Sequence, residues 1–295
     1  MVRDRELIRR ARGGDAQACF ELGEAYDFEA PKDRRRAAHW YPQAAEAGHA
    51  SAQNSLGELL RDVTNDRKEA LRWFRKAAAQ GDAGAQVSLG YALFHGEGTR
   101  RDRSEALRWY RAAARQSHAR AMFNIAQMYR TGDVVEQSWR KAIAWYLKAA
   151  RTGHVSAQHW LGRIYGGRED FSGDDREAVK WLKLAAKAGD TQSQCDLGVH
   201  FHEGKAVRRD YPKAARLYRA AADQGDTWAQ YLLGLCYRDG QGVKRSRRWA
   251  LYWLKKAAPT ERAAAREALR LAPRRNTASL RRTRDLGNAW CRCAG

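Results

Sequence analysis

The sequence repeats itself every 33 to 36 residues along most of its length. A Leu-Gly pair, replaced in one copy by Ile-Ala, recurs with this period, and so does a Trp, replaced once by Leu. The Gly-type positions are Gly23, Gly57, Gly90, Ala126, Gly162, Gly198 and Gly234, and the Trp-type positions are Trp40, Trp73, Trp109, Trp145, Trp181, Leu217 and Trp253. Two anchors that keep one period indicate seven copies of one unit, as in solenoid arrays.

Each unit is predicted to contain two helices. In the first helix, a large residue follows the Leu-type anchor by four positions, as Tyr237 follows Leu233, so both side chains share one helical face. The intervening Gly lets another helix approach closely. In the second helix, small residues flank the Trp, as Ala142 and Ala149 flank Trp145. This alternation suits interlocking packing and predicts that the Trp series belongs to the core.

The boundaries of the second helix follow the same period. A residue that favours the N-cap stands seven positions before every Trp-type anchor, namely Asp33, Asp66, Asp102, Ser138, Asp174, Asp210 and Ser246. Glycines are predicted to end the second helix in five copies, namely Gly48, Gly81, Gly153, Gly189 and Gly225. Helices of about a dozen residues are marginal alone, so the units must stack. The prediction is an all-α, α/α superhelical solenoid of about seven two-helix repeats.

The chain is expected to divide into four segments. Residues 1–15 resemble a half-repeat or cap helix, and residues 16–258 form the solenoid of seven helix pairs. Residues 259–272 are predicted to be a C-terminal capping helix. Residues 273–295 break the pattern, are rich in Arg, and are predicted to be a basic, disordered tail.

Composition narrows the classes of protein. The 295 residues carry 55 Lys and Arg against 34 Asp and Glu, which gives a net charge of +21. No segment approaches the roughly 20 apolar residues of a membrane span, and no secretory signal is visible at the start. The five cysteines are too few and too scattered for a disulfide framework. The expected location is the cytoplasm.

The repeated residues resemble the Sel-one-like repeat, a relative of the tetratricopeptide repeat with a longer period. Residues 229–243 match the first helix and loop of that motif, and Asp210 to Ala214 and Trp145 to Ala150 match its second helix. The resemblance covers roughly residues 14–258. It implies a superhelix of antiparallel helix pairs and a role as scaffold or adaptor, and it leaves the partner unidentified. Departures from the motif include Pro42 inside a second helix and Ala126 at the Gly place.

The concave face of such an array is lined by the first helices, and analogy with tetratricopeptide arrays gives its outward positions. They lie about five and two residues before the Leu-type anchor and two, five and six after it. The candidate partner-binding residues are Phe20, Tyr91, Phe94, His95, Phe123, Arg130, His159, Arg163, His202, Trp228, Tyr231 and Arg238. Aromatic residues and Arg dominate binding energy at interfaces, which favours a groove for a protein or peptide. The alternative is that several of these rings pack against neighbouring copies.

Basic clusters between the two helices give a second hypothesis. The candidate polyanion-binding residues are Arg34, Arg35, Arg100, Arg101, Arg208, Arg209, Lys244, Arg245, Arg247 and Arg248. Stacked along one edge, they could bind nucleic acid, an acidic protein or an anionic membrane surface. They could equally be a solvated edge, because no base-stacking motif accompanies them.

Catalytic and metal readings find little support. His200 and His202 are two positions apart, so they point to different sides of a helix. No zinc motif and no phosphate-binding loop is present. The prediction is therefore a protein that is not an enzyme, with no cofactor and no metal. Its expected work is to bind a protein or peptide partner, and polyanion binding is the runner-up.

Overall fold

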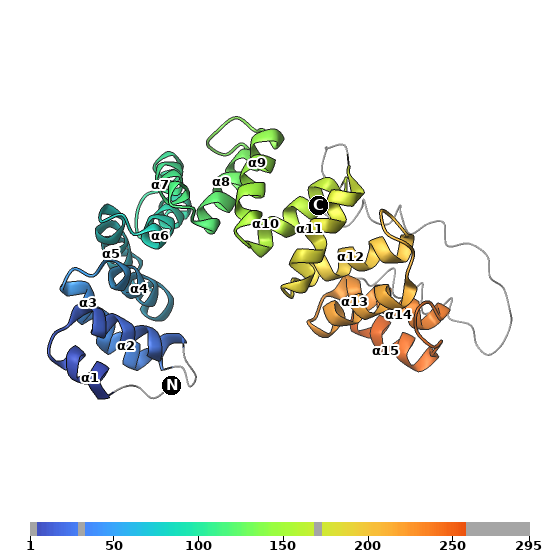
Figure 1. Ribbon diagram of the computed structural model, residues 1–295, viewed down its shortest axis with the longest axis horizontal. Coiled ribbons are helices and arrows are strands. Elements are labelled where there is room, and N and C mark those ends of the chain that lie inside the picture. The colour runs from blue at the N-terminus through green and yellow to red at the C-terminus, as the bar shows by residue number, and fades with distance from the viewer. Residues whose placement is uncertain (1–4, 29–32, 168–172, 258–295) are drawn as a thin grey trace. The chain divides into compact units, whose positions relative to one another are not determined.

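The computed structural model describes residues 5–28, 33–167 and 173–257, which form helices joined by turns without a strand. The helices, shown in Figure 1, are α1 (Arg5–Arg12), α2 (Ala16–Phe28), α3 (Arg34–Glu46), α4 (Ala50–Leu59), a π-helical turn (Leu60–Thr64), α5 (Arg67–Ala79), α6 (Ala83–His95), α7 (Arg103–Arg115), α8 (Ala119–Thr131), α9 (Trp139–Arg151), α10 (Val155–Tyr165), α11 (Asp175–Lys187), α12 (Thr191–Glu203), α13 (Tyr211–Asp223), α14 (Thr227–Asp239) and α15 (Arg247–Ala257). The all-α repeat architecture predicted from the sequence is confirmed. The predicted capping helix and tail, residues 259–272 and 273–295, lie outside the described residues.

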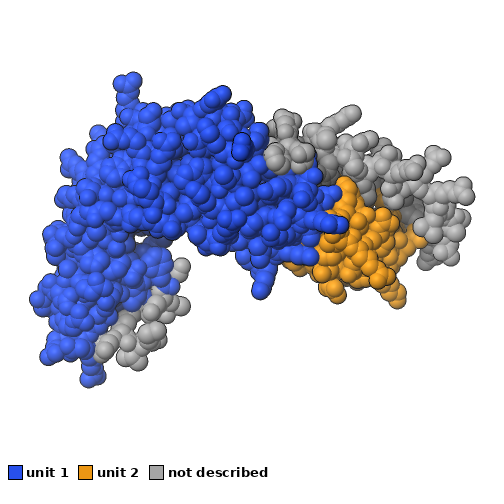
Figure 2. Space-filling view, turned by 45° about the horizontal axis from the view of Figure 1, so that its top comes forward, with its two compact units in different colours: residues 1–193 blue, residues 194–295 orange. Residues whose placement is uncertain are grey.

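The chain falls into two compact units, residues 1–193 and 194–295, which Figure 2 shows in different colours. In the first unit each helix packs on the next, and α1 packs on α2. The first helices of the repeats, α2, α4, α6, α8 and α10, lie along the inner side of this curved stack, and α3, α5, α7 and α9 lie along its outer side (Figure 1). In the second unit α13 packs on α14 and α14 on α15.

All seven predicted N-caps of the second helices are confirmed. In six of them the Asp or Ser side chain accepts a hydrogen bond from a backbone N–H in the first turn, as Asp102 does from Glu105 at 2.8 Å. In the seventh, Ser246 Oγ accepts from the N–H of Trp249 at 3.4 Å. These bonds satisfy backbone donors that the start of a helix leaves without partners, so they fix where each second helix begins.

The core series is displaced by one residue from the prediction. Trp181 and Trp253 are buried, but Trp40, Trp73, Trp109 and Trp145 are only half-buried. The residue directly after each anchor is buried instead, namely Tyr41, Phe74, Tyr110, Tyr146, Leu182, Tyr218 and Leu254. One position turns the side chain by about 100° around a helix. The four half-buried Trp rings therefore lie beside the core, where Lys side chains cover two of them, Lys76 over Trp73 and Lys148 over Trp145.

The recurring glycine of the first helix makes room for that buried residue. A Cβ placed on Gly90 would lie 2.7 Å from Tyr110 Cε1, and one on Gly198 would lie 2.6 Å from Tyr218 Cε1. Such distances are too short for a real contact, so the glycine is required by packing between the two helices of one repeat. Ala126 takes the glycine's place in the fourth copy.

Pairs of glutamines join the two helices of one repeat. Gln80 donates to Gln53 at 2.8 Å, and Gln116 donates to Gln86 at 3.1 Å. In the second unit Gln224 donates to Gln194 at 3.0 Å. The acceptor in each pair belongs to a first helix, and the donor follows the end of a second helix. The acceptor amide is buried in each pair and the donor is exposed, so the bond satisfies a buried oxygen and holds the second helix on the first helix of the same repeat.

Candidate partner-binding surface

A pocket opens between α12 and α14 in the second unit, and three of the predicted residues line it. These are His202, Trp228 and Arg238. The ring of Trp228 stacks on a fourth, Tyr231, with centroids 5.2 Å apart. The other lining residues are Val199, Glu203, Tyr218, Leu232, Leu235, Cys236, Asp239 and Gln241. The cavity holds about 60 Å³, which suits one side chain of a partner and is small for a cofactor.

The polar groups of the pocket wall bond to one another. His202 Nε2 lies 2.9 Å from Gln241 Oε1, and Arg238 pairs with Asp239 at 2.7 Å. Burial raises the pKa of the Cys236 thiol to about 12, so this sulfur stays protonated and unreactive at neutral pH. The pocket therefore offers apolar contact with a mixed-charge rim, and its thiol is unsuited to nucleophilic chemistry.

Sequence reasoning did not single out Val199 and Leu235 as pocket residues. Each stands two positions after its Leu-type anchor, Leu197 and Leu233. The rule for outward positions therefore covered them, but aliphatic residues at such places are hard to tell from core. Only the packing of α12 against α14 separates the two cases.

In the first unit, three predicted residues gather on α6. The ring of Tyr91 lies 4.3 Å from that of His95, and His95 lies 5.0 Å from Phe94. Tyr91 is 41% exposed and His95 is exposed as well. Arg103 covers Phe94 at 5.0 Å. Tyr91 and His95 thus offer free ring surface.

Arg130 of α8 and Arg163 of α10 meet at one indole. Their guanidinium carbons lie 4.5 Å and 5.0 Å from the centre of the Trp160 ring. Tyr146 stacks on the same indole at 6.2 Å, with the rings almost parallel. Sequence reasoning missed Trp160, which directly precedes its Leu-type anchor, a place that the other copies fill with Glu, Ser, Asn, Asp or Leu. The two arginines are therefore held by a shared ring, in half-buried positions.

Three further candidates pack between repeats. Phe20 stacks on His49 at 4.5 Å and Phe123 on His154 at 4.7 Å, and each of these histidines stands just before the next first helix. His159 is buried, and its Nδ1 lies 3.0 Å from Ser193 Oγ and 3.3 Å from Asp190 Oδ2. The position two residues before the anchor thus faces the cap of the following repeat, as the alternative to a groove anticipated.

The contacts at this junction shift the pKa of Asp190. Burial by itself raises its pKa, but hydrogen bonds from His159 and Ser193 outweigh burial and lower the pKa to about 2. The carboxylate also accepts from the N–H of Ser193 and so caps α12. The perturbed pKa therefore reflects a contact between repeats rather than a catalytic acid.

The candidates for a basic edge are exposed, and two of them have polar partners nearby. Arg34 pairs with Asp27 at 3.2 Å, and Arg209 donates to the carbonyl of Glu203. The remaining candidates, Arg35, Arg100, Arg101, Arg208, Lys244, Arg245, Arg247 and Arg248, have exposed side chains.

Metal and membrane features are absent from the described part of the chain. It holds no cluster of three His, Cys, Asp or Glu side chains placed to bind a metal ion. Among the helices of the described ranges, none combines the length and the apolar character that crossing a bilayer requires.

Comparison with known proteins shows which solved structures this chain is similar to. A search of curated proteins gave no match. Among solved structures, a protective antigen of uropathogenic Escherichia coli with an SLR fold is 32% identical, with a TM-score of 0.75, over 90% of this chain and 60% of that one. A Sel1 repeat protein from Oxalobacter formigenes is 28% identical, with a TM-score of 0.73, over 83% of this chain and 100% of that one.

The chain thus spans less than two thirds of the antigen's length. The model of the Sel1 repeat matches residues 16–49, 50–82, 83–118, 119–154, 155–190, 191–226 and 229–258. These matches cover most of the sequence and coincide with the helix pairs described above, so the chain belongs to the Sel1 repeat family.

Proposed function

We propose that this chain is a non-enzymatic scaffold that binds an extended segment of a protein partner along its first helices. Sel1 repeats generally serve as scaffolds for protein interactions, which supports this class of function. The finer proposal is that the pocket between α12 and α14 takes one apolar side chain of the partner. In the first unit, Tyr91 and His95 would contribute to the same kind of contact, whereas Phe20, Phe123 and His159 would serve packing between repeats.

The observation that supports the proposal is that three predicted partner-binding residues line the same pocket. His202 and Val199 come from α12, and Trp228, Leu235 and Arg238 come from α14, and together they line one hollow. Aromatic and Arg side chains around an apolar hollow are the composition of interface hot spots. A preformed hollow also lowers the entropy lost on binding.

The test uses a displayed library of random peptides, selected on the full chain. We expect the selected peptides to share an apolar or aromatic residue. Val199→Arg should block the mouth of the pocket, because Val199 is half-buried there, and should weaken peptide binding at least tenfold. The matched control is Val63→Arg, since Val63 is 56% exposed and far from the pocket in sequence.

Two results would count against the proposal. One is a library selection that yields no apolar consensus. The other is peptide binding that Val199→Arg and Val63→Arg leave equally intact. Circular dichroism of both variants shows whether the helices are retained.

Polyanion binding at the basic edge is a second proposal, and one observation favours it. The stretch from residue 240 to 257 contains Lys244, Arg245, Arg247 and Arg248 but no Asp or Glu. Its cations are exposed, and no described carboxylate pairs with them. Affinity for a polyanion should fall steeply with salt, whereas binding in the apolar pocket should not.

Other expectations also stay proposals. We propose a cytoplasmic location and the absence of a cofactor. We also propose that residues 1–15 cap the array at the N-terminal side, since α1 packs on α2.

A further inference from the structure

The last described helix breaks a rule that the other six second helices keep. Positions four and one before the Trp-type anchor lie outside the core, and they are polar or small in the other six copies. Those pairs are Arg36 and His39, Glu69 and Arg72, Glu105 and Arg108, Lys141 and Ala144, Glu177 and Lys180, and Lys213 and Arg216. In α15 the same two positions hold Trp249 and Tyr252. Both are aromatic, and they are 43% and 49% exposed.

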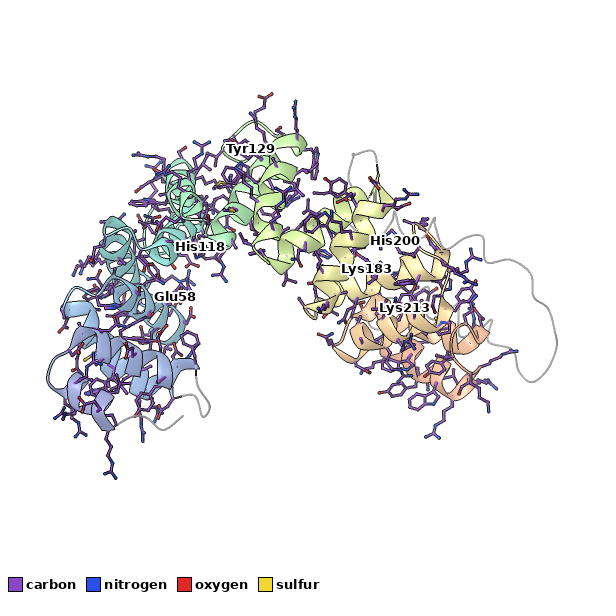
Figure 3. All side chains as sticks on the ribbon, viewed as in Figure 1. Glu58, His118, Tyr129, Lys183, His200 and Lys213 are labelled. Atoms are coloured by element: carbon purple, nitrogen blue, oxygen red, sulfur yellow. The ribbon has the colours of Figure 1, made fainter. Side chains whose placement is uncertain are left out.

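These rings are not needed to complete the repeat. In three other copies a cation at the first position covers the large residue of the preceding helix, as Lys213 covers Phe201 at 4.2 Å (Figure 3 labels Lys213). The remaining three copies hold Glu at this position. In the last copy Trp249 takes this place beside Tyr237, with centroids 6.2 Å apart. Tyr252 meets Trp249 edge to face at 5.6 Å. Charged or small side chains complete these positions in the other repeats, so the repeat does not require an exposed aromatic pair here. Such a pair indicates a ligand with a flat apolar surface.

Cations surround the two rings. We define the α15 face as Arg248, Trp249, Tyr252, Lys255 and Lys256, which are all exposed and share one side of the helix by their spacing. No described carboxylate forms an ion pair with Arg248, Lys255 or Lys256. Some edge cations of earlier repeats do have such partners, as in the pairs Arg34 with Asp27, Arg67 with Glu97 and Arg103 with Asp133.

We propose that the α15 face binds single-stranded nucleic acid, with Trp249 and Tyr252 stacking on bases and the flanking cations contacting phosphates. This inference rests on the second proposed function, polyanion binding, and is independent of the pocket. Arg248 and Lys255 are separated by about 10 Å along the helix axis, the length of about three stacked nucleotides of one strand. Stacking on exposed rings and a cationic track are the two features of sequence-tolerant single-strand binding.

Two other anionic partners fit less well. A lipid surface takes up helices with a face of Trp, Phe and Leu side chains, and on the α15 face Trp249 is the single residue of these types. An acidic protein segment would be held by charge alone, because its carboxylates have no flat surface to place on the rings. A single strand supplies negative charge and flat bases in alternation.

The experiment measures the fluorescence anisotropy of a short labelled oligothymidine with the full chain at low salt. Competitors are a duplex of the same length, polyphosphate, and vesicles of phosphatidylglycerol. We expect the oligothymidine to bind more tightly than the other three. The double variant Trp249→Ala, Tyr252→Ala should weaken its binding by about tenfold or more and leave polyphosphate binding unchanged. The matched control is Tyr91→Ala, which removes an equally exposed ring from α6.

A charge variant separates the two proposals. Arg248→Glu with Lys255→Glu should weaken oligothymidine and polyphosphate alike and reduce the salt slope by about 0.7 for each phosphate that is no longer neutralised, whereas Arg111→Glu, on α7, should do neither. Equal binding of single strand and duplex, together with no effect of the ring variant, overturns this inference while polyanion binding stands. A clear preference for vesicles overturns it in favour of lipid. Failure of every polyanion to bind removes both.

Discussion

The ring of Tyr110 lies against Gly90, so closely that a Cβ on the glycine would come within 2.7 Å of Tyr110 Cε1. Gly90 is in the interior of α6, and Tyr110 is the buried residue after the Trp-type anchor of α7. The same relationship joins Gly23 to Tyr41 and Gly198 to Tyr218. It links the two repeated anchors of the sequence in one contact.

This contact reverses the usual effect of a glycine substitution. In a free helix, Gly→Ala stabilises by about 1 kcal/mol. Gly90→Ala should instead lower the free energy of unfolding by roughly 1–2 kcal/mol, because the added methyl displaces the Tyr110 ring. Urea denaturation followed by circular dichroism measures the change. Ala126→Gly, at the equivalent place in α8, is the control and should be destabilising through helix propensity and the loss of a buried methyl. An increase in stability for Gly90→Ala would contradict the packing argument.

The N-cap of α7 gives a second prediction. Asp102 accepts a hydrogen bond from the N–H of Glu105 at 2.8 Å. Asp102→Ala leaves that donor without its side-chain partner and should cost about 1 kcal/mol of unfolding free energy. Ser104→Ala, two residues along and also exposed, should change stability by only a few tenths. Equal effects of the two substitutions would show that the cap adds nothing.

The junction of His159 with Asp190 predicts a dependence on acid. The pKa of Asp190 is lowered from 3.8 to about 2 in the fold, so the carboxylate contributes stability that is fully present above pH 4 and is lost as the pH falls towards 2. Asp190→Asn should remove about 1 kcal/mol at neutral pH, since the group is partly exposed and solvent weakens the interaction.

Thermal unfolding at pH 7, 4 and 2 measures this dependence. The difference between the variant and the parent chain should shrink towards pH 2. A constant difference would mean that the charge of Asp190 plays no part.

His118 predicts a stabilising substitution. It precedes α8, where Asp82 and Asp190 cap α6 and α12, but His118 makes no side-chain cap bond, and its Nδ1 is buried without a described hydrogen-bond partner. Burial lowers its pKa, the positive charge of Arg120 lowers it further, and Asp82 opposes the shift. Figure 3 labels His118 at the start of α8. His118→Asp should provide the missing cap and add about 1 kcal/mol.

The same substitution should change the response to pH. A histidine with a lowered pKa binds its proton more readily in the unfolded chain, so the parent protein loses stability as the pH falls through 6.5. His118→Asp should reduce that loss between pH 7 and 5, as chemical denaturation at both values would show. His39→Asp, at an exposed position outside the caps, is the control and should leave the pH response unchanged.

The sequence determined the elements of this protein because their signals are local. The seven N-caps from Asp33 to Ser246 and the glycines that end helices act on backbone groups within one helical turn. They recur with the period of the repeat, so the sequence shows where each helix begins and ends. The arrangement of helix pairs followed, since each pair must bury its apolar face on its neighbours. The predicted division into cap, array and tail stays a prediction.

Tertiary structure decided which side of each helix is core and which is surface. Tyr146 is buried where the pattern predicted burial of Trp145, and His159 is buried although the pattern predicted an exposed partner-binding residue. Both outcomes depend on the rotation of one helix against the next. A helix rotation of about 100° buries the next residue along the chain in place of its neighbour. When both residues are aromatic, the sequence pattern does not determine which of the two is buried. The pocket beside Trp228 arises in the same way, because a hollow is a property of two packed helices rather than of either one.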